Sequence, residues 1–365
     1  MEEGFIMMHQ SINTSQIEFL FSLSNVYEKN KMSVTNEINI DTLVGQIITN
    51  RIVGIAFLNL HLNNISREIR KMFDVLTKEN KRAYERFMKN LSYISYIFKN
   101  ADFEYALLKG AFLISSVYAP GCRLSNDIDV LVRSKDVSKI QGILIKNGFI
   151  QGQFDPKNKH IVPANRRDII EAKINFGETI PFIKICGEHP LVLDINFSLD
   201  FKPDKEGKVD MMLEKSVKHH IGKYDFLTLN EVDFLIHLSC HLYKEATTFD
   251  WVQWRRDLEL YKFSDINVIM HKYGTESYFS SLASRIKELN LEKECYYTFE
   301  NSSLIYPALS EIDGFIKLKE AIAPKDLTYL KQITHPIRNT IYNFDMNFKE
   351  WFACLNRVEY LQKSF

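Results

Sequence analysis

Apolar side chains recur at helical spacing through the first hundred residues of the chain. Three such sets are Ile17, Leu20, Phe21 and Leu23; Ile55, Leu58, Leu62 and Ile65; and Tyr84, Phe87, Leu91 and Ile94. Positions three and four residues apart share one face of a helix, so this recurrence predicts amphipathic helices with buried apolar stripes. Glycine is scarce and proline is absent here, which favours long helices. We expect residues 1–100 to form a helical N-terminal region.

The pattern changes near residue 101, where short apolar runs alternate with turn residues. Pro120-Gly121 interrupts one predicted helix, and Gly148 stands where a helix commonly ends on a left-handed glycine. The elements expected in order are an apolar run at 105–108, a helix at 111–118, a strand at 127–132, a helix starting near 136 and a strand at 191–197. Strands that alternate with helices predict a small α/β core over residues 101–202.

Beyond a charged connector at residues 202–208, the pattern becomes helical again. Asn230 is a good helix N-cap, and apolar residues follow it at helical spacing. A further amphipathic stretch runs over residues 251–261. We expect residues 203–365 to form a helical C-terminal lobe. The whole chain is then an α+β protein, with a small mixed-sheet core flanked by helical N-terminal and C-terminal regions.

Composition narrows the class of protein. The 365 residues are 45% hydrophobic and 25% charged, ordinary values for a soluble globular chain. Lys and Arg balance Asp and Glu at 46 each, whereas proteins that track nucleic acid usually carry a basic excess. Five cysteines at wide spacings fit reduced thiols. The sequence begins Met-Glu-Glu, unlike a secretory signal, and its best apolar run, residues 52–60, is too short to span a bilayer. We expect a cytoplasmic protein without membrane association.

Two carboxylates stand two residues apart in the strand predicted at 127–132. Asp127 and Asp129 point to the same face of that strand, while Ile128 and Val130 point to the other. Neighbouring carboxylates raise each other's pKa unless a cation or a donor neutralises them. Oxygen ligands of this kind suit Mg²⁺ or Mn²⁺. On this motif alone, a solvated strand edge is the commoner explanation.

Other residues near the carboxylate pair favour a functional site over a solvated strand edge. Lys109-Gly110 lies at a turn before a predicted helix, where glycine lets the backbone approach a phosphate. Arg123, four residues before Asp127, could pair with phosphate oxygens through its planar guanidinium. Asp194 lies in a later predicted strand, and pairing of the two strands would bring it beside the carboxylate pair. Together these residues predict a metal and phosphate site.

The run Leu108-Lys109-Gly110, the segment 118–123 and the run Asp127-Ile128-Asp129 together resemble the active-site motif of the DNA polymerase β-like nucleotidyltransferases. They look most like the bacterial group described as uncharacterised nucleotidyltransferases. The superfamily motif is Gly-Ser before a short helix, then Asp-x-Asp, then a later Asp on a neighbouring strand. Here Lys-Gly stands where Gly-Ser is usual, and the interval to the first Asp is longer than in most members. The resemblance is specific over about residues 105–200.

This resemblance implies metal-dependent transfer of a nucleoside monophosphate from a nucleoside triphosphate (NTP), such as ATP, to an acceptor hydroxyl or similar group, with release of pyrophosphate. The implied catalytic and metal-binding residues are Asp127, Asp129 and Asp194. They would hold two Mg²⁺ (or Mn²⁺) ions about 3.5–4 Å apart. The implied triphosphate-binding residues are Lys109, Gly110 and Arg123. The acceptor stays open, with a small molecule or peptide favoured over tRNA because the chain has no basic excess.

A looser similarity extends into the helical lobe, where the family has a histidine followed by a tryptophan and an Asp-Leu pair. Candidate substrate contacts there are His237, His241 and Asp257. The two histidines share a helix face, but packing or substrate contact is favoured over zinc because the glutamate of H-E-x-x-H is missing. For Asp257, a structural pairing with Arg255 or His241 is the favoured alternative to substrate contact.

Two alternatives stay open at this stage. The superfamily includes catalytically inactive binding or regulatory modules, although retention of three carboxylates argues against that function here. Trp251 and Trp254 share a predicted helix face and could stack a base, although a place in the core is commoner for such residues. The chain has no Walker A loop and no G-x-G-x-x-G or G-x-S-x-G motif, which disfavours other nucleotide-binding and hydrolase classes.

Overall fold

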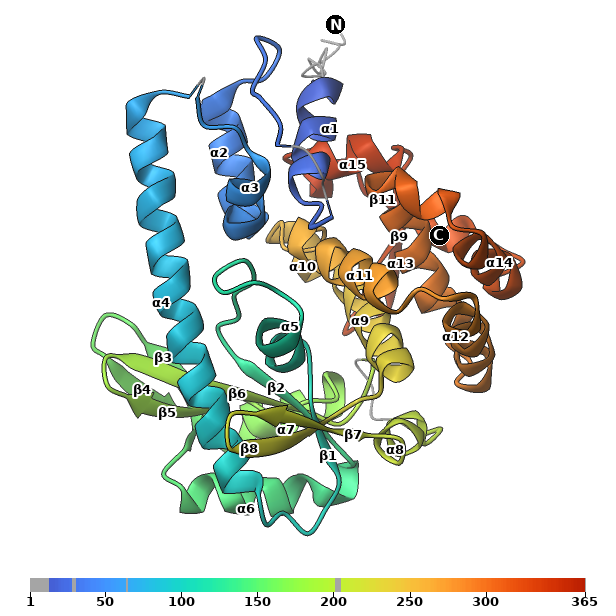
Figure 1. Cartoon of the computed structure of the whole chain (residues 1–365). Helices are drawn as coiled ribbons and strands as arrows, with labels where there is room; N and C mark the ends of the chain where they lie inside the picture. The colour runs from blue at the N-terminus through green and yellow to red at the C-terminus, as the bar shows by residue number, and fades with distance from the viewer. Residues whose placement is uncertain (1–12, 28–30, 64, 201–204, 365) are drawn as a thin grey trace, which may run out of the picture.

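The structure is a computed structural model that describes residues 13–27, 31–63, 65–200 and 205–364 (Figure 1). Its helices are α1 (Thr14–Leu23), α2 (Ile40–Thr49), α3 (Val53–Asn59), α4 (Arg67–Phe98), α5 (Gly110–Ser116), α6 (Val137–Lys146), α7 (Arg166–Asn175), α8 (Lys208–Leu213), α9 (Glu231–Ala246), α10 (Phe249–Gln253), α11 (Leu260–Tyr273), α12 (Glu276–Glu288), α13 (Glu292–Ile305), α14 (Asp313–Ile322) and α15 (Phe348–Ala353). Its strands are β1 (Tyr105–Leu107), β2 (Ile128–Val132), β3 (Ile150–Asp155), β4 (His160–Pro163), β5 (Phe182–Cys186), β6 (His189–Asn196), β7 (Val217–Ile221), β8 (Tyr224–Thr228), β9 (Gln332–His335), β10 (Thr340–Asn343) and β11 (Gln362–Lys363). The α+β class expected from the sequence is confirmed.

Strands β1 to β6 form one mixed sheet in the order β1-β2-β6-β5-β3-β4. β2 and β6 run parallel, and the other neighbouring pairs are antiparallel. In the parallel pair, Asp129 stands directly opposite Asp194. The strands expected at 127–132 and 191–197 are confirmed as β2 and β6. Their pairing is the feature that assembles the site described below.

Helices α4 and α6 pack against one face of this sheet. Ile128, Val130 and Ile195 share a buried apolar cluster with Leu91 and Ile94 of α4. Figure 1 shows α4 running down one side of the molecule, from the N-terminal helices to the sheet. Phe73, near the start of this 32-residue helix, is buried in a different cluster from the residues between 87 and 98 that face the sheet, so the two ends of α4 contact two parts of the fold.

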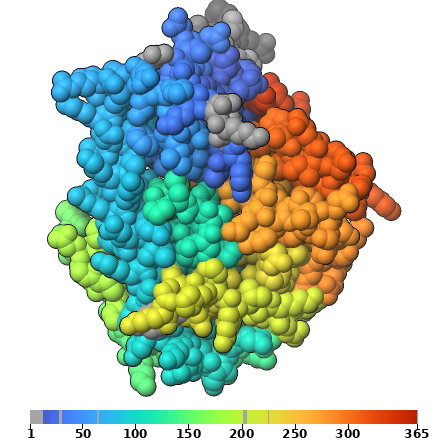
Figure 2. All heavy atoms as spheres, in the orientation of Figure 1, coloured from blue at the N-terminus to red at the C-terminus, as the bar shows by residue number. Residues whose placement is uncertain are grey.

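The N-terminal helices α1 to α3 share a second buried cluster with the helices of the C-terminal lobe and with the other face of the sheet. Phe21 of α1 meets Phe352 of α15 edge to face, with ring centroids 5.0 Å apart. The Ser24 hydroxyl lies 2.8 Å from the Tyr306 hydroxyl. On the face shown in Figure 2, the teal segment that contains α5 is bordered by blue N-terminal residues, by yellow residues below it and by orange residues of the C-terminal lobe. The two ends of the chain thus build one wall above the sheet.

Several predicted helix boundaries are confirmed. The Asn230 side chain caps α9 by accepting hydrogen bonds from two backbone N–H groups, and Gly148 ends α6 with a φ of +82°. The apolar stripe expected over residues 55–65 is helical only as far as Asn59. The chain leaves the helix there because His61 and Asn59 bond to the backbone of Met32 in a short parallel bridge.

The amphipathic stretch expected over residues 251–261 is not one helix. It divides into the end of α10, a turn, and the start of α11. Arg255 in this turn has a left-handed φ of +56°, and Asp257 is fully buried in an ion pair with Arg357. A long-range partner therefore overrides the local helical pattern. The connector expected at 202–208 lies partly outside the described residues. No helix within the described ranges has both the length and the apolar character to cross a membrane.

A close contact between α3 and the loop after α5 positions the residues that lead into Arg123. A Cβ atom on Gly54 would lie 2.3 Å from the carbonyl oxygen of Gly121 and 2.6 Å from the Cα of Cys122. Such distances require one backbone to move. From the opposite side, Asn80 of α4 donates a hydrogen bond of 3.1 Å to the same Gly121 oxygen. The loop is thus held between two helices.

We expect Gly54→Ala to destabilise the protein by about 1–3 kcal/mol, because overpacking forces backbone shifts. The matched control is Gly45→Ala in α2, where an added Cβ meets nothing within 4 Å. That change should stabilise the protein by about 0.5–1 kcal/mol, because alanine is the better helix former. Urea denaturation followed by circular dichroism measures both. Equal effects of the two substitutions would contradict the close contact.

Candidate functional site

Three carboxylates gather on one face of the parallel pair β2 and β6. Asp129 and Asp194 are paired residues of these strands and therefore point to the same side. Asp127 lies two residues before Asp129, immediately ahead of β2. All three line one cavity. The strand pairing thus brings Asp194 beside the Asp-x-Asp motif.

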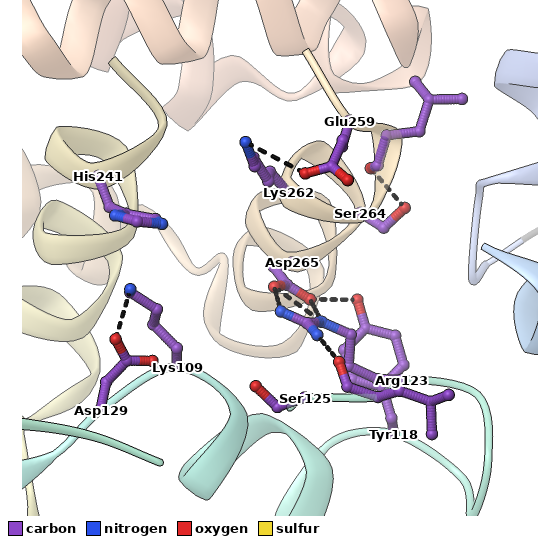
Figure 3. Close-up of polar contacts among 12 residues, drawn as sticks. Lys109, Tyr118, Arg123, Ser125, Asp129, His241, Glu259, Lys262, Ser264 and Asp265 are labelled. Carbon is purple, nitrogen blue, oxygen red and sulfur yellow. Dashed lines mark hydrogen bonds and ion pairs between the residues drawn. The ribbon is translucent and has the colours of Figure 1, made fainter. Parts of the chain in front are cut away.

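Lys109 neutralises one of these carboxylates. Its Nζ lies 2.7 Å from Oδ1 of Asp129 (Figure 3). Lys109 immediately precedes α5 and has a φ of +43°, which is uncommon for a residue other than glycine. The backbone N–H of Leu108 donates a hydrogen bond of 2.9 Å to the carbonyl oxygen of Asp129. The turn before α5 is therefore attached to Asp129 through both its backbone and its side chain.

Gly110 lets the loop before β2 come close to this turn. A Cβ on Gly110 would lie 2.8 Å from the Cβ of Ser125 and 2.9 Å from its hydroxyl oxygen. The Ser125 hydroxyl in turn donates a hydrogen bond of 2.9 Å to Oδ1 of Asp127. A side chain at position 110 would displace the residue that orients Asp127. The close contact with Ser125 therefore requires glycine at position 110.

Burial and mutual repulsion both raise the pKa values of carboxylates in this cluster. Burial, followed by the charges of Asp127 and Asp129, raises the pKa of Asp194 well above its ordinary value. Burial also raises the pKa of Asp129, although Lys109 acts in the opposite direction. Within the described part of the chain, Oδ1 of Asp194 is buried without a hydrogen-bond partner. An unpartnered anionic oxygen in a negative cluster is a place where a cation would be stabilising.

A cavity of about 680 Å³ lies between the carboxylates and the helical lobe. This volume falls within the range of about 300–1,000 Å³ typical of ligand pockets. The sheet contributes the three carboxylates, and α7 contributes Asp168 and Glu171. The opposite wall comes from the end of α9, from α10 and from the start of α11. The cavity is therefore acidic on the sheet side and mixed on the helical side.

Arg123 belongs to the cavity wall, but its guanidinium already has a carboxylate partner. Its Nε and Nη2 donate hydrogen bonds of 2.9–3.1 Å to both oxygens of Asp265, which also accepts one of 2.9 Å from the Tyr118 hydroxyl (Figure 3). The guanidinium carbon lies 4.2 Å from the ring centroid of Tyr261. Arg123 is only 5% exposed. The group fixes the junction between the loop before β2 and helix α11.

The helical wall contains a second buried charged group. Lys262 forms ion pairs with Glu245 and, at 3.6 Å, with Glu259. Nε2 of His241 lies 3.4 Å from the carboxylate of Glu245. Burial, followed by the positive charges of Lys109 and Lys244, holds the pKa of His241 well below its ordinary value. At neutral pH, His241 is a neutral imidazole at the cavity, which can exchange hydrogen bonds with a ligand but carries no charge.

The part of the chain that builds this cavity matches a known protein family. Residues 36–307, well over half of the chain, match the family described as uncharacterised nucleotidyltransferase. The chain belongs to this nucleotidyltransferase family. Membership gives it the general activity of nucleotidyl transfer. A search of curated proteins found no match.

Most residues predicted for the site of this nucleotidyltransferase do meet in the cavity. Those that line it are Lys109, Arg123, Asp127, Asp129, Asp194 and His241. Gly110 lies just behind Ser125, which lines the cavity as well. His237 lies one turn before His241 and is buried outside the lining, where burial and nearby lysines lower its pKa to about 3. Asp257 is also outside the lining, and its partner is Arg357 rather than Arg255 or His241.

The sequence prediction missed several residues that line the cavity of this nucleotidyltransferase. They are Arg51, Arg256 and Tyr261. Trp251 and Trp254, for which the sequence favoured a place in the core over base stacking, line the cavity as well. The expectation that both tryptophans belong to the core is wrong, because Trp254 is 62% exposed. No local signal marks Arg51, which reaches the cavity from the turn between α2 and α3. Among the described residues, neither Arg51 nor Arg256 has an ion-pair partner, although Arg51 lies 4.8 Å from the ring centroid of Tyr261.

The donor chemistry of the carboxylates fits a divalent cation, but their present arrangement does not hold one. Across the described residues, no group of three or more His, Cys, Asp or Glu side chains is placed to bind a metal ion. Asp129 is instead engaged by Lys109. Oxygen donors, mutual repulsion and the unpartnered Oδ1 of Asp194 are nevertheless features that Mg²⁺ or Mn²⁺ would satisfy. The ammonium group of Lys109 would compete with a cation for Oδ1 of Asp129.

Asp194→Asn should stabilise the metal-free protein at neutral pH. The folded state binds the Asp194 proton more tightly than the unfolded chain does, because burial and neighbouring carboxylates raise the pKa. The native protein therefore loses stability as the pH rises from the unfolded pKa, about 4, through the higher folded value. A neutral amide avoids this loss.

Urea denaturation in the presence of a chelator checks this expectation. We expect a gain on the order of 1 kcal/mol at pH 8 and a smaller gain at pH 5. Asp74→Asn, on the exposed face of α4 and outside the carboxylate cluster, is the matched control and should change stability less than Asp194→Asn does at pH 8. A loss of stability in Asp194→Asn at pH 8 would contradict the repulsion.

Proposed function

We propose that this protein transfers a nucleoside monophosphate from an NTP to an acceptor hydroxyl or similar group, with Mg²⁺ or Mn²⁺, and releases pyrophosphate. The observation that carries the proposal is the placement of Asp129 opposite Asp194, with Asp127 adjacent, in the cavity of a nucleotidyltransferase family member. The motif over residues 108–132 supports placing the chain in the DNA polymerase β-like superfamily. The acceptor is a small molecule or a peptide in this proposal, since the chain has no basic excess.

Asp127, Asp129 and Asp194 would hold the divalent cation. Bound there, Mg²⁺ would neutralise the carboxylates and the charge that develops on the phosphate oxygens. The unpartnered Oδ1 and the raised pKa of Asp194 support this assignment. The ion pair of Lys109 with Asp129 provides a substitute positive charge when no cation is present.

The reaction forms one bond and breaks one. The acceptor oxygen attacks the α-phosphorus, the bond from that phosphorus to the oxygen bridging the α- and β-phosphates breaks, and pyrophosphate leaves with the electron pair. Asp194 is the proposed acceptor for the hydroxyl proton, because its raised pKa suits proton transfer near neutral pH. His241, neutral at the cavity, would orient a ligand through a hydrogen bond.

Positive groups on the cavity wall would bind the triphosphate. Lys109 would turn from Asp129 to the phosphates, and the backbone N–H at Gly110 begins α5 beside it. We add Arg51 to this set, because it lines the cavity without an ion-pair partner among the described residues. Direct phosphate binding by Arg123 stays a prediction, since its guanidinium is paired with Asp265.

Asp127→Asn and Asp129→Asn should each lower turnover by at least about 10²-fold, because each weakens binding of the cation that would stabilise the charge of the transition state. Product masses and pyrophosphate release with each NTP and candidate acceptors measure turnover. A thermal shift with nucleotide, with and without Mg²⁺, measures binding. Asp74→Asn should match the wild type. A Mg²⁺-dependent shift that persists in both variants would contradict the metal role, and nucleotide binding without any transfer would favour an inactive binding module.

Arg51→Met should raise the KM for NTP by about 10- to 100-fold with kcat little changed, because a charge-assisted contact to phosphate contributes about 1.5–3 kcal/mol of binding. Arg51→Lys should show a smaller effect. The control is Arg82→Met on α4, whose side chain is exposed and pairs with Glu79. An unchanged KM in Arg51→Met would remove Arg51 from the phosphate site.

A further inference from the structure

Two of the three tryptophans in the chain stand at the cavity instead of in the core. Trp251 of α10 is partly buried, and Trp254, which follows that helix, is 62% exposed. Their rings meet edge to face, with centroids 5.9 Å apart and planes at 72°. The third, Trp351, is buried and stacked on Phe344. Since an exposed indole forgoes hydrophobic stabilisation, a tryptophan pair at a cavity points to a ligand.

Residues near the C-terminus anchor α10 and the turn after it, which carry these rings. Asp257, fully buried, forms an ion pair with Arg357. Arg357 also donates hydrogen bonds of 2.6 Å to the carbonyl oxygens of Trp351 and Phe352. These partners lie beyond residue 307, where the family match ends. The turn after α10 is therefore anchored, and this restricts the backbone that carries the rings, which reduces the entropy lost on binding.

Cations flank the aromatic pair. The guanidinium of Arg256 lies 5.4 Å from the ring centroid of Trp251, and Nζ of Lys262 lies 5.6 Å from it. Lys262 also donates a hydrogen bond of 2.5 Å to the carbonyl oxygen of Arg256. Lys262 is paired with Glu245, whereas Arg256 has no ion-pair partner among the described residues. This wall therefore combines flat aromatic faces with a positive charge that is free to meet an anion.

A planar ring joined to an anionic chain matches this combination. Aromatic side chains bind nucleobases face to face, and such stacking tolerates every base because each has a π-face. An arginine beside the rings favours phosphate oxygens. Of the two ligands in the proposed reaction, the NTP carries both features by its chemistry.

We propose that Trp251 and Trp254 form the platform that binds the nucleobase of the NTP, in which the base stacks on the exposed ring of Trp254 and Trp251 supports that ring edge to face. Arg357 is the positioning residue that holds this platform through Asp257. The inference rests on the proposed function and adds to it the site of the base. Because a platform touches ring faces and not hydrogen-bonding edges, it binds all four bases, with purines bound more tightly than pyrimidines because their larger faces stack more strongly.

Intrinsic fluorescence tests the platform directly, because Trp351 is buried away from the cavity. The wild-type protein is titrated with ATP, GTP, CTP, UTP and inorganic tripolyphosphate. We expect saturable quenching by nucleotides, at lower concentrations for purines, and none by tripolyphosphate, which should still compete with ATP. Trp351→Phe should retain the quenching, and Trp254→Phe should diminish it. Quenching that is equal in Trp254→Phe and the wild type would overturn the assignment.

Kinetics provides a second test. Trp254→Ala should raise the KM for NTP by about 5- to 150-fold, the equivalent of one stacked base, with kcat nearly unchanged. Trp254→Phe should recover most of the loss, because a phenyl ring also stacks. Ile337→Ala, which shortens another exposed apolar side chain, is the matched control. A KM in Trp254→Ala equal to that of the wild type would overturn the platform.

The anchor is tested by replacing both members of its ion pair. The double variant Asp257→Leu with Arg357→Met avoids leaving one buried charge without a partner. We expect a folded protein with a raised KM for NTP, an unchanged kcat and weaker nucleotide quenching. A purely structural anchor would lower stability without changing KM or quenching, and that result would remove the positioning role. Trp254→Ala tests the platform independently of how this variant folds.

Failure of the platform and failure of the proposed function give different results. Nucleotide quenching that depends on Trp254, without pyrophosphate release for any acceptor, would leave the platform standing and overturn transfer. The opposite result has two parts: Asp127→Asn loses pyrophosphate release, and Trp254→Ala keeps the wild-type KM for NTP. This result would support transfer and overturn the platform.

Discussion

The parallel pairing of β2 with β6 is the constraint on which the rest of the site depends. It places Asp129 directly opposite Asp194, so that two carboxylates share a face with Asp127 beside them. Negative charge so concentrated and so buried is unfavourable without a compensating cation. Two local features respond to this charge. The turn at Lys109, where φ is positive, brings an ammonium group to Asp129. The close approach of Gly110 to Ser125 places the hydroxyl that orients Asp127.

Most buried cations around the cavity have a carboxylate of their own. Lys109 has Asp129, Arg123 has Asp265 and Lys262 has Glu245. Buried pairs of this kind contribute little net stability, but removing one partner is costly, so they hold neighbouring elements in a defined position. The cations without a partner among the described residues, Arg51 and Arg256, lie at the same cavity. The distribution separates groups that hold the wall from groups that can meet a ligand.

The sequence predicted features that depend on neighbouring residues, and it did not predict those that depend on contacts between distant segments. The strands expected at 127–132 and 191–197, the spacing of the Asp-x-Asp motif and the Asn230 cap are local patterns, and all appear in the structure. The strands β7 to β11 were not predicted, because residues 203–365 were expected to form a helical lobe. Asp194 could be found because the strand that contains it is recognisable from its own sequence, without knowledge of the strand with which it pairs. The positions of Trp251 and Arg51 could not, because each depends on packing between segments far apart in the chain. The helical pattern over 251–261 failed for the same reason: Arg357 holds Asp257 in a turn.

The contact between α1 and α15 has a consequence for how the protein is made. Both helices lie outside the matched segment 36–307, yet Phe21 meets Phe352, and Lys349 pairs with Glu18 at 2.7 Å. Joining such distant segments adds only modestly to the entropy of loop closure, but it delays the contact. During synthesis on the ribosome, all six strands of the sheet are available to pair once residue 196 has emerged. Helix α1 can contact α15 only after almost the whole chain has been made. The acidic floor of the cavity can therefore form during synthesis, before the helical wall above it closes.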